Sequence, residues 1–95
     1  MLRLELSQNI DNALAFSMLA ITLAAQDREK EALPAVERAI SLEPNNPYHF
    51  YAHSFVLGQL KKYQDALPAI QTAIRLDPLN AHFYGHLSSL YLSLK

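Results

Sequence analysis

The sequence predicts an all-α fold of five main helices, arranged as antiparallel pairs that stack into a superhelix. Three observations lead to this prediction. The chain matches itself at an offset of 34 residues, a period typical of stacked helix pairs. Asparagines recur at that offset before each run with helical apolar spacing, at positions Asn12, Asn46 and Asn80. Prolines recur after two later runs, at Pro44 and Pro78, and a proline disfavours helical geometry in the residue before it.

The expected helices follow from these signals in chain order. The first helix of each pair is expected at residues 13–26, 47–60 and 81–94, and the second at residues 29–42 and 63–76. Each asparagine is a predicted N-cap, whose side chain accepts a hydrogen bond from a free backbone N–H of the first turn. Pro47 suits the first helical position because its missing N–H would have no partner there. Pro34 and Pro68 fall inside the second helices, where we expect a mild kink near the helix start.

Apolar stripes with helical spacing identify the expected core. In the first pair these residues are Phe16, Leu19, Ala20, Leu23, Ala32, Val36 and Ala39, and in the second they are Phe50, Ser54, Leu57, Ala66, Ile70 and Ala73. The last helix adds Tyr84, Leu87, Ser88, Tyr91 and Leu94. Alanines on these stripes let two helix backbones approach closely, while the larger side chains fill the flanks.

This arrangement resembles the tetratricopeptide repeat family. The pattern of that family has an aromatic residue, a leucine, a small residue and a tyrosine on the first helix, then an alanine, a bulky residue, an alanine and a proline on the second. Residues 13–46 and 47–80 resemble two full repeats, and residues 81–95 resemble the first helix of a third, acting as a C-terminal cap. The main departure is His53, where a leucine is usual. Residues 1–12 are expected to form a leader or a short helix packed on the first repeat.

Composition argues against several classes of protein. The formal net charge of −1 argues against a nucleic-acid binder, which needs a basic surface. The absence of cysteine excludes disulfides, a thiolate nucleophile and a cysteine-ligated zinc site. No serine stands in a recognisable arrangement with a histidine and an acid, so we predict no catalytic residues, no cofactor and no enzymatic activity.

The stretch at residues 13–25 is almost entirely apolar but does not predict a membrane segment. It has 13 residues, whereas a membrane-spanning helix needs about 20. Glu5 and Asp11 precede it, where a signal peptide would carry positive charge. We therefore expect a buried helix, no membrane span and a cytoplasmic protein.

The four histidines of the chain lie in two similar stretches, HFYAH at residues 49–53 and HFYGH at residues 82–86. The stretches are 33 residues apart, whereas the repeat period is 34, so the two histidine pairs are rotated relative to each other by one helical step of about 100°. We therefore predict that they do not converge on a metal ion. The expected state is a neutral, hydrogen-bonded His53 in the core, with His82 and His86 facing solvent or a ligand.

Resemblance to this family implies a concave surface, lined by the first helix of each pair, that binds partner peptides or helices. On it we place Leu14, Ser17, Met18, Ile21, Tyr48, Tyr51, Phe55, Gly58, Gln59, His82, His86 and Ser89, and we expect Leu14, Met18, Ile21, Tyr48, Tyr51, Phe55, His82 and His86 to contact the partner. None is Lys, Arg or Asn, the residues with which co-chaperones of this family grip a C-terminal carboxylate. The predicted ligand is therefore an apolar peptide or an amphipathic helix, as for a chaperone-like adaptor. Such a stripe is also typical of helix packing, so part of it can serve only to pack neighbouring helices.

The end of the chain suggests an alternative function. The predicted last helix carries more apolar residues than one side can bury, among them Phe83, Leu90 and Leu92. Either the chain is a fragment of a longer array, or this helix pairs with another copy. The alternative prediction is a self-associating scaffold that forms a homodimer through its C-terminal helix.

Overall fold

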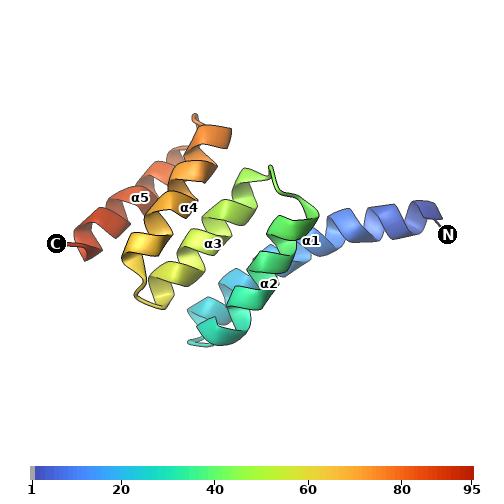
Figure 1. Ribbon diagram of the computed structural model, residues 1–95, viewed down its shortest axis with the longest axis horizontal. Helices are drawn as coiled ribbons and strands as arrows, with labels where there is room; N and C mark the ends of the chain where they lie inside the picture. Colours follow the sequence, from blue (N-terminus) through green and yellow to red (C-terminus); the bar gives the residue numbers. More distant parts are fainter. Residues whose placement is uncertain (1) are drawn as a thin grey trace.

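The computed structural model describes the backbone of residues 2–95 and the side chains of residues 12–95. Within this range the chain forms five α-helices and no β-strand, which confirms the predicted all-α repeat fold. The helices are α1 (Leu2–Ala25), α2 (Glu29–Leu42), α3 (Pro47–Gln59), α4 (Tyr63–Leu76) and α5 (Ala81–Ser93). Helices that follow one another along the chain lie side by side in space (Figure 1).

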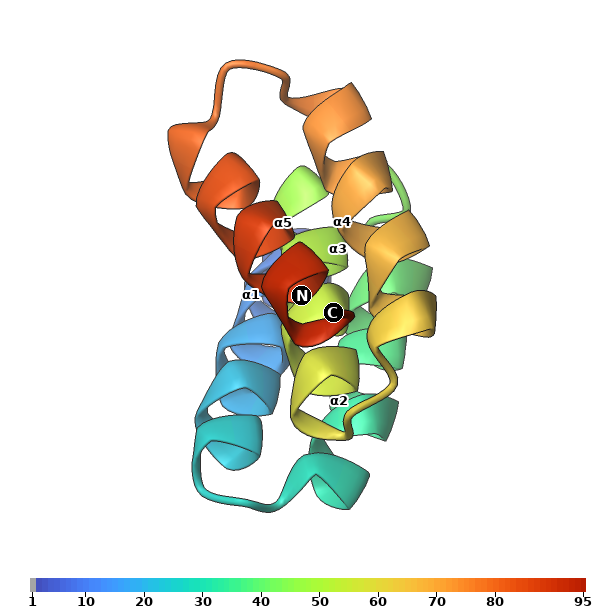
Figure 2. The same ribbon diagram turned by 90° about the vertical axis from the view of Figure 1, so that its left-hand side faces the viewer.

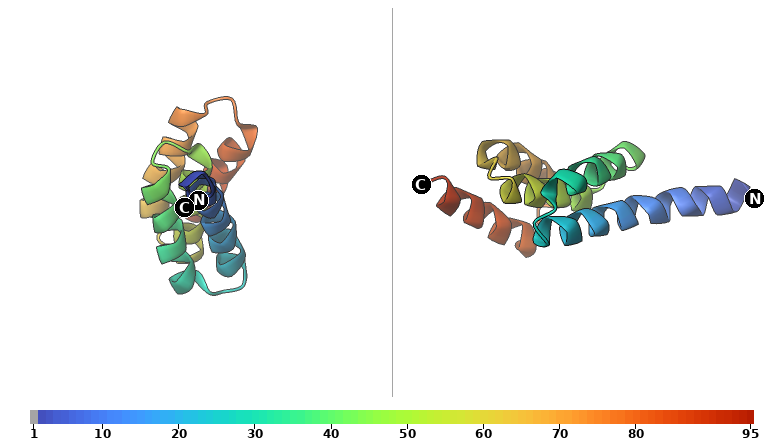
Figure 3. Two further views of the ribbon diagram at one scale, coloured as in Figure 1. Left: turned by 90° about the vertical axis from the view of Figure 1, so that its right-hand side faces the viewer. Right: turned by 90° about the horizontal axis from the view of Figure 1, so that it is seen from below.

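The helices form two layers with α3 at the junction. α1 and α5 lie on one side of the molecule and α2 and α4 lie on the other (Figures 2 and 3). α3 packs against all four of the other helices. This order allows side chains of α1, α3 and α5 to share one face.

The start of α1 differs from the prediction. The helix begins at Leu2 instead of residue 13, and its first turns project beyond the other helices (Figures 1 and 3). The predicted N-cap at Asn12 is therefore wrong, because this residue lies inside the helix. No glycine or proline precedes Pro34 to stop a helix, and asparagine in a helix interior costs only a few tenths of a kcal/mol. Packing of residues 1–12 on the first repeat stays a prediction, because the side chains of residues 1–11 lie outside those that the structure describes.

The two other asparagine caps are confirmed. The Oδ1 atom of Asn46 accepts a hydrogen bond from the backbone N–H of Tyr48 at 2.9 Å, and that of Asn80 accepts one from His82 at 3.1 Å. Each bond satisfies a backbone donor that the first helical turn leaves free. These caps fix where α3 and α5 start, and so where their first-turn side chains lie.

The turns inside the two pairs share one geometry. Asp27 and Lys61 have positive φ angles of 62° and 63°. The backbone N–H that follows each of them bonds back across the end of the helix, from Arg28 to the carbonyl of Leu23 at 2.8 Å and likewise after Lys61. This is the Schellman helix ending, which usually places glycine at the left-handed position. Both non-glycine residues therefore carry backbone strain.

The core stripes predicted for the second helices are confirmed. The predicted core side chains of α2 and α4 are all completely buried: Ala32, Val36, Ala39, Ala66, Ile70 and Ala73. All of them except Ala39 belong to two apolar clusters, one between α1, α2 and α3 and one between α3, α4 and α5. Leu33 packs against both clusters and so joins the two pairs into one body.

The stripes predicted for the end helices are partly wrong. Leu19 is 48% exposed, while Ala13, Ser17 and Ala24 are buried in its place. His53 is the residue of α3 that corresponds to Leu19, 34 positions later, and it lies near Glu37 of α2. This position of a first helix therefore faces the preceding pair. Among the described helices only α2 and α3 pack against α1, which leaves the Leu19 side chain about half exposed.

α5 shows the same effect at the other end. Tyr84, Ser88, Tyr91 and Leu94 were predicted to be core residues, but all four are exposed. In α3 the equivalent face is covered by α4, whereas no described helix covers it in α5. The buried residues of α5 are instead Phe83 and Leu90, which face the second pair.

Candidate functional site

Three neighbouring cavities lie along α3 and α5. The largest, which we call the Tyr48 cavity, has about 540 Å³ and is lined by Ile21, Pro47, Tyr48, Tyr51, Asp77, Asn80, His82 and Phe83. The Phe55 cavity has about 310 Å³ and is lined by Tyr51, Phe55, His82, Gly85, His86 and Ser89. The Ser93 cavity has about 290 Å³ and is lined by Phe55, Gly58, Gln59, Tyr63, His86, Ser89, Leu90 and Ser93. Neighbouring cavities share lining residues, and the surface that the three line together is called the groove below.

Most of the residues predicted to contact a partner line this groove. They are Ile21, Tyr48, Tyr51, Phe55, His82 and His86. Leu14 and Met18 of α1 are exposed but line none of the three cavities. Ser17 is completely buried, so its predicted place on the concave surface is wrong. The groove is therefore built mainly by α3 and α5.

Tyr51 is the central ring of the groove. It stacks on Phe83 with ring centroids 5.6 Å apart and planes 23° apart, and its centroid lies 6.1 Å from that of Tyr48. Its hydroxyl is hydrogen bonded to Nε2 of His82 at 2.9 Å. Burial raises the pKa of the Tyr51 hydroxyl, so it stays neutral and hydrogen bonding. Tyr51 thus packs α3 on α5 and also presents part of its ring to the groove.

His86 is held by the neighbouring helix. Its Nε2 atom lies 2.9 Å from Oγ of Ser54, whose hydroxyl donates to the carbonyl of Ala66 at 2.8 Å. Because the Ser54 hydrogen is used there, Nε2 of His86 must carry the proton and donate to Oγ. Burial lowers the pKa of His86, with the bond to Ser54 opposing this and the nearby His82 adding to it. The groove therefore presents a neutral imidazole at this point.

A buried chain of hydrogen bonds joins α1 to α3. Nδ1 of His49 lies 2.6 Å from Oγ of Ser17, and Nε2 lies 2.7 Å from Oε1 of Glu43. A carboxylate only accepts, so Nε2 donates to Glu43, and in the neutral imidazole Nδ1 then accepts from Ser17. The bond from His49 lowers the pKa of Glu43. Hydrogen bonds therefore join a serine, a histidine and an acid that the sequence analysis did not single out as a group.

This chain of bonds can hold α3 against α1. Ser17 and His49 are both completely buried, whereas a nucleophilic serine has to be reachable by its substrate. The same spacing of 32 residues links Ser54 to His86, between α3 and α5. Two serine–histidine pairs at one spacing are the signal in the sequence that could have revealed both contacts.

The histidine that the core holds by hydrogen bonds is His49, not His53. The His53 side chain is half-buried, and among the described residues it has no side-chain hydrogen bond. Burial lowers its pKa, and the charge of Glu37 partly opposes this. His53 is therefore a neutral imidazole packed at the junction of the two pairs.

The imidazoles do not gather around one point. His49 faces Ser17 and Glu43, whereas His82 and His86 face Tyr51 and Ser54. In the part of the chain whose side chains are described, no group of three or more His, Cys, Asp or Glu is placed to hold one metal ion.

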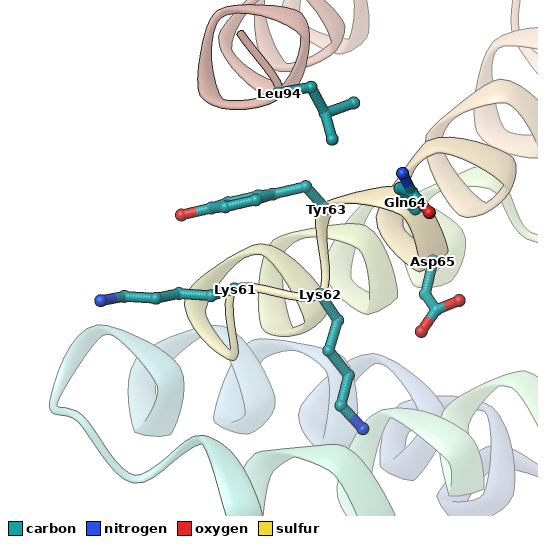
Figure 4. A pocket seen from close by; sticks show the side chains of 6 residues that line it. All are labelled: Lys61, Lys62, Tyr63, Gln64, Asp65 and Leu94. Carbon is teal, nitrogen blue, oxygen red and sulfur yellow. The ribbon is translucent and has the colours of Figure 1, made fainter.

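A further depression lies at the turn between α3 and α4. It has about 340 Å³ and is lined by Lys61, Lys62, Tyr63, Gln64, Asp65 and Leu94. Figure 4 shows the Leu94 side chain above the ring of Tyr63, with the two lysine side chains extending away from each other. It shares Tyr63 with the Ser93 cavity, but none of the residues predicted to contact a partner lines it.

Comparison with known proteins identifies a family for part of the chain. The family model of the tetratricopeptide repeat matches residues 13–46, the stretch predicted to be the first repeat. No curated protein matches the sequence. Among the described helices, none combines the length and the apolar character that crossing a membrane requires.

Proposed function

Since this chain belongs to the tetratricopeptide repeat family, we propose that it is a non-catalytic protein-interaction module that binds an apolar peptide or an amphipathic helix in its groove. The observation that carries this proposal is the row of three cavities with shared lining residues along α3 and α5, which includes Tyr48, Tyr51 and Phe55. Repeats of this family generally act by binding proteins.

The chemistry of the groove favours an apolar ligand. Among the described residues that line it, none is Lys or Arg. Asn80 lines the Tyr48 cavity, but its side chain already caps α5 and donates to Asp77. A carboxylate would find no basic partner there, whereas an apolar side chain would cover aromatic rings. Burial of one aromatic anchor stabilises a complex by about 1.5–3 kcal/mol.

The non-catalytic character is supported by the place of the serine–histidine–acid chain. Ser17 and His49 lie inside the protein and not along the groove. The imidazoles that do line the groove, His82 and His86, are bonded to Tyr51 and Ser54. A general base would instead need to face the reacting group of a bound substrate.

Calorimetric titration tests this proposal. Peptides selected from a random library on the immobilised domain are titrated into the wild type and into Phe55→Ala. Phe55 lines two of the cavities, so we expect its removal to weaken binding about tenfold or more. Tyr91→Ala, on the outer face of α5, is the matched control and should leave the affinity unchanged. Equal affinities for wild type and Phe55→Ala would refute the groove as the binding site.

A second candidate function is self-association through α5. Its outer face exposes Tyr84, Tyr91 and Leu92, the last to 66%. From Ala81 to Ser93 this helix contains no Asp, Glu, Lys or Arg, so two copies could meet there without like-charge repulsion. We propose that a second copy of the chain covers this face in a two-fold symmetric dimer. Light scattering over a range of concentrations tests it, and a monomer at the highest concentration would refute it.

A further inference from the structure

Two equivalent acids, one repeat apart, have different surroundings. Glu43 precedes the N-cap of α3, and its Oε1 accepts hydrogen bonds from Nε2 of His49 at 2.7 Å and from Nδ2 of Asn46 at 3.2 Å. Asp77 precedes the N-cap of α5, and its Oδ2 accepts from Nδ2 of Asn80 at 3.3 Å. The residue equivalent to His49 is Phe83, which has no side-chain N–H to donate. The second acid therefore lacks the imidazole partner of the first.

The carboxylate of Asp77 lies at an aromatic cavity. Asp77 is half-buried and lines the Tyr48 cavity of about 540 Å³. The rings of Tyr48, Tyr51 and Phe83 line the same cavity. The centroid of the His82 ring lies 5.0 Å from that of Tyr51, with the two planes 61° apart. Aromatic faces beside a carboxylate form a surface that attracts positive charge.

The helix N-termini near this cavity do not reverse the sign of its charge. α3 and α5 both start there, and a helix N-terminus carries about half a positive elementary charge. The first-turn N–H groups of Tyr48 and His82 are already bonded to Asn46 and Asn80. Asp77 carries a full negative charge, and no Lys or Arg is among the residues that line the cavity. Charge complementarity therefore favours a cation over an anion or a neutral group.

We propose that the Tyr48 cavity receives an arginine or lysine side chain of the bound peptide. The inference rests on the proposed function of the groove and specifies its ligand: an apolar segment that carries one basic residue. The cationic head lies against the faces of Tyr48 and Tyr51 and pairs with the carboxylate of Asp77. The alkyl stem of the same side chain covers the rest of the aromatic surface. A planar guanidinium suits this site best, because it stacks on rings and bonds a carboxylate with two N–H groups.

Three small probes test the charge preference without a known partner. N-acetyl-arginine N-methylamide, its norleucine analogue and its glutamate analogue are titrated into the ¹⁵N-labelled domain. We expect the arginine probe to shift the amide signals of Tyr51, Asp77 and His82, and to bind about fivefold more tightly than the norleucine probe. Added salt should reduce this difference. No shift of these signals by the arginine probe, or equal binding of the norleucine or glutamate probe, would overturn the proposal.

An isosteric pair of variants assigns the preference to Asp77. Asp77→Asn keeps an acceptor for Asn80 and removes the charge, so we expect it to weaken the arginine probe about fivefold and to leave the norleucine probe unchanged. Asp65→Asn, in the first turn of α4, makes the same charge change outside the groove and should alter neither. Equal binding of the arginine probe to both variants would refute the role of Asp77. The peptide test with Phe55→Ala is independent, because Phe55 does not line the Tyr48 cavity.

Discussion

The Oγ atom of Ser17 on α1 lies 2.6 Å from Nδ1 of His49 on α3, and both side chains are completely buried. The contact spans the junction between two helix pairs, where the other packed side chains are mostly small and apolar. A buried polar atom that loses its partner costs about 1–3 kcal/mol. This pair therefore makes the junction specific for one packing arrangement as well as stable.

Removal of this hydroxyl should destabilise the domain. In Ser17→Ala the Nδ1 atom of His49 loses its donor inside the protein, so we expect the free energy of unfolding to fall by about 1–3 kcal/mol. Urea unfolding followed by circular dichroism measures this. Ser88→Ala, the same change on the exposed face of α5, is the control and should not destabilise. Equal stability of the two variants would show that the Ser17–His49 bond contributes nothing.

Relief of backbone strain at the turn between α3 and α4 should stabilise the domain. Lys61 has a φ of 63°, a conformation that costs a non-glycine residue roughly 1–2 kcal/mol. Glycine adopts it freely but loses more chain entropy on folding, so we expect Lys61→Gly to stabilise by about 0.5–1 kcal/mol. Thermal unfolding measures the difference. Lys62→Gly, one residue later at a φ of −91°, removes no strain and should not stabilise.

Stability should fall as the pH is lowered from neutral toward 5. Burial lowers the folded-state pKa values of His53 and His86 below the reference value of 6.5. At pH values between these folded-state pKa values and 6.5, the unfolded chain binds more protons than the folded chain. The contribution of the two histidines to stability is therefore complete above pH 6.5 and is lost as the pH falls below it. The lowered pKa of Glu43 adds a separate loss below its reference value of 4.5. Urea unfolding at pH 7.5 and 5.5 measures the slope.

One variant measures how much His53 contributes to this pH dependence of stability. His53→Leu restores the residue usual at this position in the family and removes one titrating group. We expect it to unfold at higher urea concentration at pH 5.5 and to show a weaker dependence on pH than the wild type. An unchanged pH dependence would mean that His53 binds protons equally in the folded and unfolded states.

Self-association, if it uses the outer face of α5, should be sensitive to charge on that face alone. Tyr91→Glu places a carboxylate among exposed apolar residues and should convert the dimer to a monomer in light scattering. Ser89→Glu adds the same charge to the groove side of the same helix and should leave the dimer intact. A dimer that survives Tyr91→Glu would place the contact elsewhere.

Periodicity predicted the second helices of the pairs well, because their surroundings repeat. Ala32 of α2 and Ala66 of α4 are equivalent residues, and both pack against first helices in the apolar clusters. Apolar residues at helical spacing in the sequence therefore form a buried stripe in both helices. The asparagine caps of α3 and α5 were predictable for a similar reason, since capping depends on a few neighbouring residues.

The end helices were predicted less well because burial there depends on which neighbours exist. Leu19 and Tyr91 occupy positions that are covered inside an array, but α1 and α5 each lack one neighbour among the described helices. Ser17 was placed on the concave surface from its repeat position alone, and its contact with His49 depends on a residue 32 positions away. Asn12 has the residue type of a cap but lacks the helix break that a cap needs.

The measurement that tests the central proposal most directly is a chemical-shift map of the ¹⁵N-labelled domain with a library-selected peptide. A peptide seated in the groove should shift the amide signals of residues that line it, such as Tyr48, Tyr51, Phe55, His82, His86 and Ser89. Signals from the outer faces of α2 and α4, such as those of Arg38 and Gln71, should stay in place. Shifts confined to those outer faces, with Tyr51 and Phe55 unaffected, would contradict the groove as the binding surface.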